Sequence, residues 1–331
     1  MKKFLALTLA CILSLSMLTA CGSGENSSLT KVTLSEVAHS IFYAPMYVAI
    51  EEGYFEEEGI RLDLVTAFGA DKVTTAVLSG EADIAFMGSE STIYVYNQKT
   101  DDPLVNFAQL TQRAGNFVVA REPMDNFKWS DLKNTDVLGG RKGGMPQMVF
   151  EYVLKKNGID PATDLKIDQS IDFGSTAAAF SGGKGDYTIE FEPSATALET
   201  EGAGFVVASL GEASGYVPYT AFSAKQSFLD ANPDIIQRFT NALQKGMDYV
   251  NTHTPEEIAQ IIQPQFKETD LSQITLIVKR YHDQHTWKED LVFSENSFKL
   301  LQHILMEAGE LDAMVPYDAL VNTVFAENAI K

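Results

Sequence analysis

The feature that most constrains the fold of this 331-residue chain is a regular alternation of short apolar segments with amphipathic helical segments. The alternation runs through two series, over residues 31–87 and 117–222, and its apolar segments are short enough to be strands. Residues 223–331 carry only helical periodicity. Because strands that alternate with helices form largely parallel sheets covered by helices, the sequence predicts an α/β fold of two units followed by a helical tail.

Glycine and proline mark the ends of several of these segments, as where Pro146 opens a helical pattern that stops before Gly158. The expected strands lie at residues 31–37, 60–65, 84–87, 117–120, 137–138, 187–191, 206–207 and 219–222. The expected helices lie at residues 45–52, 71–79, 146–157, 234–252, 255–263, 271–284, 295–308 and 317–328.

Residues 1–20 have the pattern of a signal peptide. Lys2 and Lys3 precede an apolar run that is shorter than the roughly 20 residues of a membrane-spanning helix. The run ends in Leu18-Thr-Ala-Cys21-Gly, which resembles the lipobox of bacterial lipoproteins. The resemblance implies that Cys21 is lipidated and anchors the protein to the extracytoplasmic face of the cell membrane. An ordinary secretory signal with a chance cysteine is the alternative.

Residues 21–28 are rich in glycine and serine, which is typical of a flexible linker. Cys11 and Cys21 are the only cysteines, so the chain beyond the linker has no thiol for a disulfide, a metal cluster or a nucleophile. We therefore expect no metal site and no cofactor.

The chain is strongly acidic. It carries 45 Asp and Glu against 25 Lys and Arg, a formal net charge of -20. This charge repels phosphate backbones, so we expect no nucleic-acid partner.

Two loops of the first unit follow expected strands, where open α/β sheets bind ligands. Phe42 and Tyr43 would offer aromatic faces there, and Ser89 and Glu90 would offer polar groups. The alternative is that Phe42 and Tyr43 are interior packing for their loop.

The second unit contributes a glycine-rich run and two carboxylates. The run 139–144 leads into a helix, so that backbone N–H groups at Gly143 and Gly144 could contact a ligand; a mere tight turn is the alternative. Glu190 and Glu192 project to one face of an expected strand. We expect at least one of them to receive an amino or amidine-like group of a ligand, with a surface or interlobe salt bridge as the alternative.

Four segments resemble motifs of one protein family. Residues 42–59 (FYAPMYVAIEEGYFEEEG) are similar to its opening motif A-x-x-x-G-(Y/F)-(Y/F)-x-x-x-G, and residues 78–86 to its L-x-x-G-x-A-D segment. Glu192-Pro193 followed by Ala195 is similar to its E-P-x-A, and residues 228–239 to its F-x-x-x-(N/H)-P helix entry. On these motifs the chain is identified as a member of the ABC-importer substrate-binding proteins of the nitrate/sulfonate/taurine and thiamine-pyrimidine group.

The resemblance implies a two-lobed periplasmic-binding-protein fold of type II with two interlobe crossings. Lobe 1 would comprise residues 29–116 and 223–331, and lobe 2 residues 117–222. The lobes would close on a small molecule by hinge motion, and the partners would be an ABC permease and its ATPase subunits. The protein itself is expected to be a monomer.

Members of this family differ in the class of ligand that they bind. Sulfonate and nitrate carriers are expected to use cationic and hydroxyl donors, for which Arg113 and Arg141 are candidates, whereas pyrimidine binders are expected to use aromatic residues and carboxylates. Phe42, Tyr43 and Tyr219 with the carboxylates favour a small nitrogen-rich or aromatic molecule such as a thiamine-pyrimidine precursor; a sulfonate, taurine or nitrate is the alternative.

Two further functions remain as alternatives. The family also includes a pyrimidine synthase that consumes its own histidine and carries a cysteine cluster. Here Tyr43 stands where that branch places its histidine, with His39 nearby but offset, and the body has no cysteine. We therefore expect a protein that is not an enzyme. A surface adhesin with an inactive cleft is the third possibility.

Overall fold

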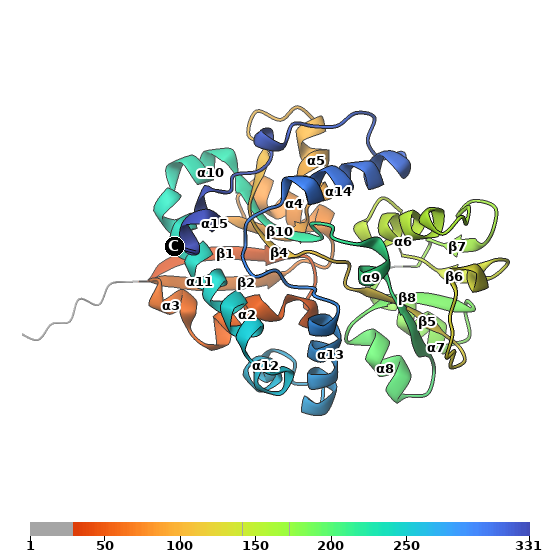
Figure 1. The fold of residues 1–331 in the computed structure, drawn as a ribbon. Helices are drawn as coiled ribbons and strands as arrows, with labels where there is room; N and C mark the ends of the chain where they lie inside the picture. The colour runs from red at the N-terminus through yellow and green to blue at the C-terminus, as the bar shows by residue number, and fades with distance from the viewer. Residues whose placement is uncertain (1–28, 141, 172) are drawn as a thin grey trace, which may run out of the picture.

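The computed structural model describes residues 29–140, 142–171 and 173–331, which form two lobes side by side (Figure 1). Each lobe is built on a five-stranded sheet, with strand orders β2-β1-β3-β10-β4 and β7-β6-β8-β5-β9. This is the expected α/β, two-sheet architecture, and helices follow the second sheet along the chain. The expected segments 1–20 and 21–28, together with Cys21, lie outside the described residues.

In the first sheet, three parallel strands are joined by one antiparallel strand to a fifth. Strand β1 pairs in parallel with β2 and β3, and β10 runs antiparallel between β3 and β4. The strands are β1 (Thr30–Glu36), β2 (Ile60–Thr66), β3 (Ile84–Gly88), β4 (Leu104–Thr111) and β10 (Thr220–Lys225). The helices among them are η1 (Ile41–Tyr43), α2 (Ala44–Glu51), α3 (Tyr54–Glu57), α4 (Ala70–Ser79) and α5 (Glu90–Asn97).

The second sheet repeats this arrangement. Strand β6 pairs in parallel with β7 and β8, and β5 runs antiparallel to β8 and β9. The strands are β5 (Asn116–Ala120), β6 (Asp136–Leu138), β7 (Lys166–Asp168), β8 (Tyr187–Phe191) and β9 (Phe205–Ser209). The helices are η2 (Trp129–Leu132), α6 (Met145–Lys156), η3 (Phe173–Ser175), α7 (Thr176–Ser181), α8 (Ser194–Thr200) and α9 (Leu210–Ser214).

The tail returns to the first lobe. Helix α11 packs against α2, α3 and α15, while α14 reaches over to α6 of the second lobe (Figure 1). The tail comprises α10 (Gln226–Ala231), α11 (Pro233–Thr252), α12 (Pro255–Ile262), η4 (Gln263–Gln265), α13 (Leu271–Asp283), α14 (Glu295–Glu307), η5 (Tyr317–Ala319) and α15 (Val324–Ala329).

One expected helix, at residues 317–328, is wrong. The chain there makes a short 3-10 turn and then extends along β4, where Val321 forms a bridge with Asn106. The Asn106 N–H donates to the Leu320 carbonyl at 2.8 Å, and the Asn322 N–H donates to the Asn106 carbonyl at 2.9 Å. Pairing with the sheet edge therefore replaces the central turn of the expected helix, which begins again at Val324 as α15.

The expected lobe boundaries need correction at both crossings. Asn116, expected in lobe 1, is the first residue of β5 in the second sheet. Residues 220–222, expected in lobe 2, belong to β10 of the first sheet. Ladder pairing decides both cases, because β10 bonds to β3 and β4 from Thr220 onward. The chain crosses between the sheets in residues 112–115 and 215–219.

Buried aromatic side chains fill the first lobe beside the crossings. Phe86 stacks on Phe222 with ring centroids 4.2 Å apart, joining neighbouring strands β3 and β10. Helix α11 lies so close to α2 that a Cβ on Gly246 would overlap the Pro45 carbonyl. In the part of the chain that the structure describes, no helix has the length and apolar character to cross a bilayer.

Candidate functional site

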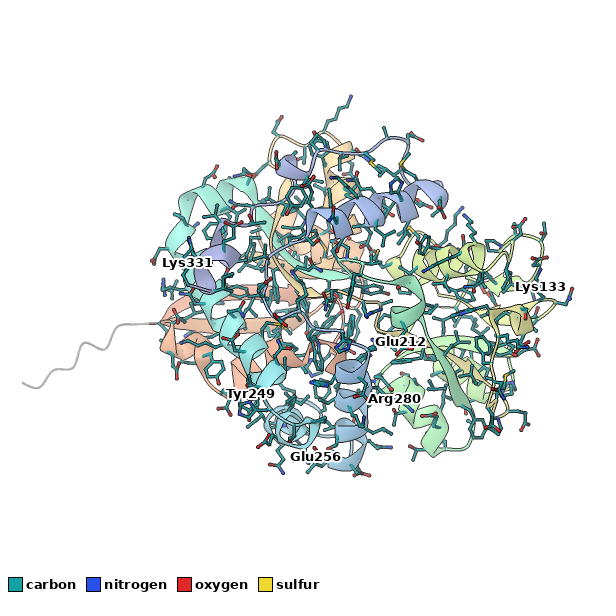
Figure 2. All side chains as sticks on the ribbon, in the orientation of Figure 1. Lys133, Glu212, Tyr249, Glu256, Arg280 and Lys331 are labelled. Carbon is teal, nitrogen blue, oxygen red and sulfur yellow. The ribbon has the colours of Figure 1, made fainter. Side chains whose placement is uncertain are left out.

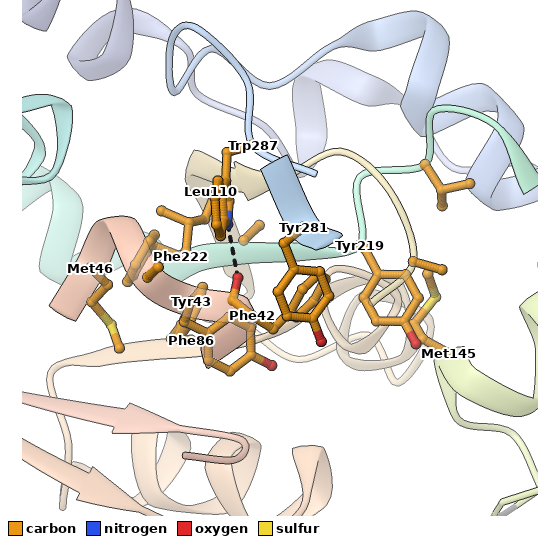
Figure 3. Packing of buried hydrophobic residues seen from close by; sticks show 14 of the residues in the cluster. Phe42, Tyr43, Met46, Phe86, Leu110, Met145, Tyr219, Phe222, Tyr281 and Trp287 are labelled. Carbon is orange, nitrogen blue, oxygen red and sulfur yellow. Dashed lines mark hydrogen bonds between the residues drawn. The ribbon is translucent and has the colours of Figure 1, made fainter. Parts of the chain in front are cut away.

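The two crossings meet at a junction of aromatic side chains between the lobes (Figure 3). Phe42 on η1 lies 5.7 Å from Tyr219 and 5.7 Å from Phe191 by ring centroids, and 5.2 Å from Tyr43. Trp287 fixes the same turn, because its indole N–H donates to the Phe42 carbonyl at 2.9 Å. The junction thus brings together Phe42, Tyr43 and Tyr219.

The junction is closely packed in this closed arrangement. Phe42 is fully buried, and Tyr43 and Tyr219 are 5% exposed. A Cβ on Gly115, in the first crossing, would lie 2.6 Å from the Phe42 ring and 2.8 Å from Phe191. Phe42 and Tyr43 are therefore interior packing here, and their contact with a ligand stays a prediction.

Asn116 is the polar residue at this junction that sequence reasoning missed. It begins β5 directly opposite Phe191 of β8, so their side chains share one face of the sheet. Its side chain is fully buried, yet neither its amide nitrogen nor its amide oxygen has a hydrogen-bond partner among the described residues. The sequence signal that could have identified Asn116 is a polar residue at the start of an otherwise apolar strand.

The Tyr219 hydroxyl is another buried polar group of the junction without a partner in the described chain. Its ring lies 6.0 Å from that of Phe191, the residue paired with Asn116. Burial, and to a smaller extent the nearby charge of Glu90, raise the pKa of Tyr219 well above its usual value. The hydroxyl therefore stays protonated and able to donate a hydrogen bond.

Ser89 and Glu90 lie at the start of α5, on the lobe 1 side of the junction. The Ser89 hydroxyl donates to the Pro218 carbonyl in the second crossing. Glu90 is 4% exposed and folds its carboxylate back over Gly88. Its charge also contributes to the raised pKa of Tyr43, after burial and Glu36, as it does to that of Tyr219.

Arg113 is held by lobe 2 rather than turned to the aromatic rings. Its Nη1 donates to the Gly211 carbonyl at 2.9 Å, and its guanidinium lies 4.3 Å from the centre of the Tyr216 ring. Its Nε is buried without a partner in the described part of the protein. The other expected cation, Arg141, lies outside the described residues.

The glycine-rich run contacts lobe 1 across the junction. The Gly143 N–H donates to Gln147 Oε1 at 2.8 Å, so it is already satisfied within lobe 2, and Gly144 is the N-cap of α6. The Tyr94 hydroxyl of α5 donates to the Gly143 carbonyl at 3.2 Å. In this structure Gly143 therefore bridges the lobes through its carbonyl, while ligand contact by its N–H remains untested.

Glu190 lies inside lobe 2, hydrogen bonded to two threonines. The Thr188 hydroxyl donates to Glu190 Oε1 at 2.6 Å, and Thr176 is a second partner. Burial raises the pKa of Glu190 to about 7, despite the opposing effect of these hydrogen bonds. The carboxyl is thus partly protonated near neutral pH.

Glu192 forms the interlobe salt bridge that the sequence left as an alternative. Its fully buried carboxylate lies 2.8 Å from Nη1 of Arg280, which also pairs with Glu199. Figure 2 shows Arg280 on α13, on the side of that helix that faces lobe 2. The Thr196 N–H donates to Glu192 Oε2 at 2.8 Å and its hydroxyl to Oε1 at 3.0 Å. This carboxylate is therefore occupied by protein donors instead of meeting an amino group of a ligand.

Further hydrogen bonds join the lobes on both sides of the junction. The Ser40 hydroxyl donates to the Glu192 carbonyl at 2.8 Å, and Lys155 Nζ of α6 donates to the Glu307 carbonyl at the end of α14 at 2.6 Å. One groove lies between α8 of lobe 2 and α13 of lobe 1, and another lies between α7 and α8 within lobe 2. The aromatic junction itself is shielded from solvent, so access to it requires the lobes to separate, and we call this arrangement the closed form.

His39 packs against Tyr47 and Phe266, with ring centroids 4.9 Å and 4.8 Å away. Its Nδ1 is 3.0 Å from Glu36 Oε1 and its Nε2 is 2.9 Å from the Gln265 carbonyl. The hydrogen bond to Glu36 is the main cause that raises the pKa of His39. Both ring nitrogens are therefore engaged by the loop and the tail.

Comparison with known proteins gives a consistent assignment. The family model described as "NMT1/THI5 like" matches residues 41–258. The Bacillus subtilis (strain 168) protein YtlA, which carries the name of a binding protein, is 47% identical over 328 residues, covering 99% of this chain and 98% of the relative. The 4-amino-5-hydroxymethyl-2-methylpyrimidine phosphate synthase of Aspergillus parasiticus is 23% identical over 67% of each chain.

The solved structures share the fold. The alkanesulfonate-binding protein SsuA from Xanthomonas axonopodis pv. citri, bound to MOPS, superposes with a TM-score of 0.71 at 15% identity, covering 89% of this chain and 99% of that one. At this identity the likeness concerns the fold alone. The two lobes of this chain, whose junction carries the buried polar groups described above, therefore share the fold of that protein.

Proposed function

The chain belongs to the NMT1/THI5-like family of ABC-importer substrate-binding proteins, and from this premise we propose that it captures a small nitrogen-rich aromatic solute between its lobes. The observation that carries the proposal is the closed junction, where Asn116 and the Tyr219 hydroxyl are buried beside aromatic rings without protein partners in the described chain. A ligand that satisfies such groups in the closed form alone would stabilise closure and create the surface that a permease recognises.

Charge at the junction favours this ligand class over an anion. The buried Glu90 carboxylate contributes to the raised pKa of Tyr43 and of Tyr219, and Arg113 is engaged by Gly211 and Tyr216. An anion next to Glu90 would meet a carboxylate, whereas an amino group would be attracted to it. Arg113, whose buried Nε has no partner among the described residues, is the group that would favour an anion. A thiamine-pyrimidine precursor has the required chemistry, and the name of the Aspergillus relative points to the same pyrimidine. A sulfonate, taurine or nitrate is the second candidate, supported by the printed name of SsuA.

We also propose that the protein works as a monomeric lipoprotein, anchored through Cys21 on the extracytoplasmic face of the membrane. From there it would deliver the solute to a permease coupled to ATPase subunits. The lipobox and the linker pattern of residues 21–28 support this placement.

The same reasoning favours binding over catalysis. YtlA carries the name of a binding protein, and the synthase match is of low identity. Both ring nitrogens of His39 are engaged by Glu36 and Gln265. We propose that solute capture is the function of the cleft.

The ligand is tested on the chain from residue 21 with Cys21→Ser, which keeps every described residue. Native mass spectrometry would reveal a copurified molecule, and thermal shifts would compare 4-amino-5-hydroxymethyl-2-methylpyrimidine with taurine, MOPS and nitrate. A ligand at 100 times its Kd adds about 2.7 kcal/mol of stability. We expect the shift with the aminopyrimidine; a shift with taurine, MOPS or nitrate alone would reject the proposed ligand class.

The anchor is tested in cells on the full chain. Cys21→Ser should move the protein from the membrane fraction to a soluble one, because the lipid attachment residue is lost. Cys11→Ser is the matched control and should leave the protein in the membrane fraction. Equal retention of both variants would contradict lipid anchoring at Cys21.

A further inference from the structure

Two buried asparagines lie in the strands of the two sheets, Asn106 in β4 and Asn116 in β5, and their surroundings differ. Asn106 in β4 donates through Nδ2 to Thr92 Oγ1 at 2.9 Å and to the Leu320 carbonyl at 3.1 Å. Asn116 is equally buried, but both polar atoms of its amide lack a partner in the described residues. A buried polar group of this kind costs free energy, so its presence requires a compensating role.

The position of Asn116 indicates what that role is. It lies at the end of the first crossing, opposite Phe191, whose ring approaches Phe42 and Tyr219. Gly115 leaves no side chain between Asn116 and these rings. The amide therefore belongs to the aromatic junction that opens when the lobes separate.

The chemistry of the amide restricts its partner. A primary amide presents its carbonyl oxygen and one of its two N–H donors side by side, so a partner that offers an adjacent donor and acceptor in the same plane bonds both polar atoms at once. The edge formed by an exocyclic amino group and the neighbouring ring nitrogen has this pattern. Sulfonate and nitrate offer acceptors only, and would leave the amide oxygen buried and unpaired.

We propose that Asn116 is a specificity-determining residue that reads the amino–ring-nitrogen edge of a flat heterocycle lying against Phe42, Phe191 and Tyr219. This rests on the proposed function, and adds to it the group that selects aminated heterocycles over anions. The unpaired amide of Asn116 costs free energy in the ligand-free protein. It gains its hydrogen bonds when the lobes close around the heterocycle.

The experiment uses the chain from residue 21 with Cys21→Ser and compares Asn116→Leu with Asn106→Leu. The first variant replaces an unsatisfied amide by an apolar side chain of similar size, so the ligand-free protein should keep or raise its Tm. The second leaves Thr92 and Leu320 without their donor and should lower the Tm. A structural role for Asn116 would instead make the two variants behave alike.

Binding is measured by calorimetry with two probes, 4-amino-5-hydroxymethyl-2-methylpyrimidine and the same molecule without its 4-amino group. The unchanged Asn116 protein should prefer the aminated probe at least tenfold, since a site built to bond a group rejects an analogue that lacks it. Asn116→Leu should lose that preference and bind both probes with equal, weaker affinity. Asn116→Asp keeps acceptors but loses the N–H₂ donor, and should lose the preference too.

The outcomes separate this inference from the proposed function. Tight binding of the aminated probe that Asn116→Leu leaves unchanged would overturn the role of Asn116 alone. A drop in Tm as large as that of Asn106→Leu would overturn it by showing a structural role. A protein that binds neither pyrimidine would reject the proposed ligand class and the role of Asn116 together, whether or not taurine, MOPS or nitrate binds.

Discussion

Replacing Arg280 by methionine should weaken both the fold and the closed arrangement of the lobes. Arg280 of α13 holds the buried Glu192 carboxylate and also pairs with Glu199, and both glutamates belong to lobe 2. Methionine keeps much of the apolar stem and removes only the guanidinium. The variant therefore leaves a charge inside the interlobe contact without its counter-ion.

The size of the effect follows from burial. The Glu192 side chain is 0% exposed and that of Arg280 is 22% exposed. Removing one partner of a buried pair costs about 3–5 kcal/mol. We expect the lower end, about 3 kcal/mol, because Thr196 still donates two hydrogen bonds to Glu192 and water reaches the Arg280 side.

The assay is urea unfolding followed by tryptophan fluorescence, since Trp287 lies at the junction. Lys279→Met on the same helix is the matched control. Lys279 pairs with Asp283, and both side chains are 58% exposed. An exposed pair of this kind contributes only about 0.2–1 kcal/mol, so the control should change the free energy of unfolding little.

Lobe separation is measured with spin labels on cysteines introduced at Glu256 of α12, labelled in Figure 2, and at Glu201 directly after α8. The chain from residue 29 onward has no cysteine of its own, so labelling is specific. Arg280→Met should lengthen and broaden the distance distribution in the ligand-free protein. If Arg280→Met matched Lys279→Met in both stability and distance, the salt bridge would not hold the lobes and this reasoning would be refuted.

Three further predictions follow from single side chains. Burial raises the pKa of Glu190 to about 7 from an ordinary 4.5, so its contribution to stability is fully present below pH 4.5 and is lost as pH rises through 7. The loss reaches roughly 3 kcal/mol, and Glu190→Gln should flatten the stability profile between pH 5 and 8 in urea unfolding; an unchanged slope would exclude Glu190. Gly246→Ala should lower the Tm sharply, because its Cβ overlaps the Pro45 carbonyl, whereas Gly174→Ala, with open space around its Cβ, should leave the Tm within a degree or two; equal effects would argue against the close α2–α11 packing. Ser40→Ala should weaken ligand affinity several-fold in calorimetry with the aminopyrimidine, because Ser40 both caps η1 and donates to the Glu192 carbonyl across the lobes, and an unchanged Kd would show that this contact does not contribute to closure.

Local periodicity predicted much of the secondary structure. The expected helices at 146–157, 234–252 and 271–284 agree with α6, α11 and α13 to within one residue at each end, and the strand at 187–191 agrees with β8. These elements carry apolar stripes or caps within their own segments, so neighbouring residues suffice to define them.

Elements that depend on distant partners were not predictable in this way. Strand β4 (Leu104–Thr111) was missed, although every residue of it is buried, because its pairing partner β10 lies more than a hundred residues further along the chain. The same cause ended the expected helix at 317–328, where the chain pairs with β4 instead.

The candidate site shows the same division. The sequence by itself determined the family, the two α/β units, and the set of aromatic and acidic residues that follow the strands, because local patterns and motifs encode them. Only the tertiary structure decided that Glu192 is paired with Arg280 while Asn116 is left without a protein partner. Whether a buried polar group is satisfied depends on atoms that the fold brings from far along the chain, and no pattern within its own strand contains that information.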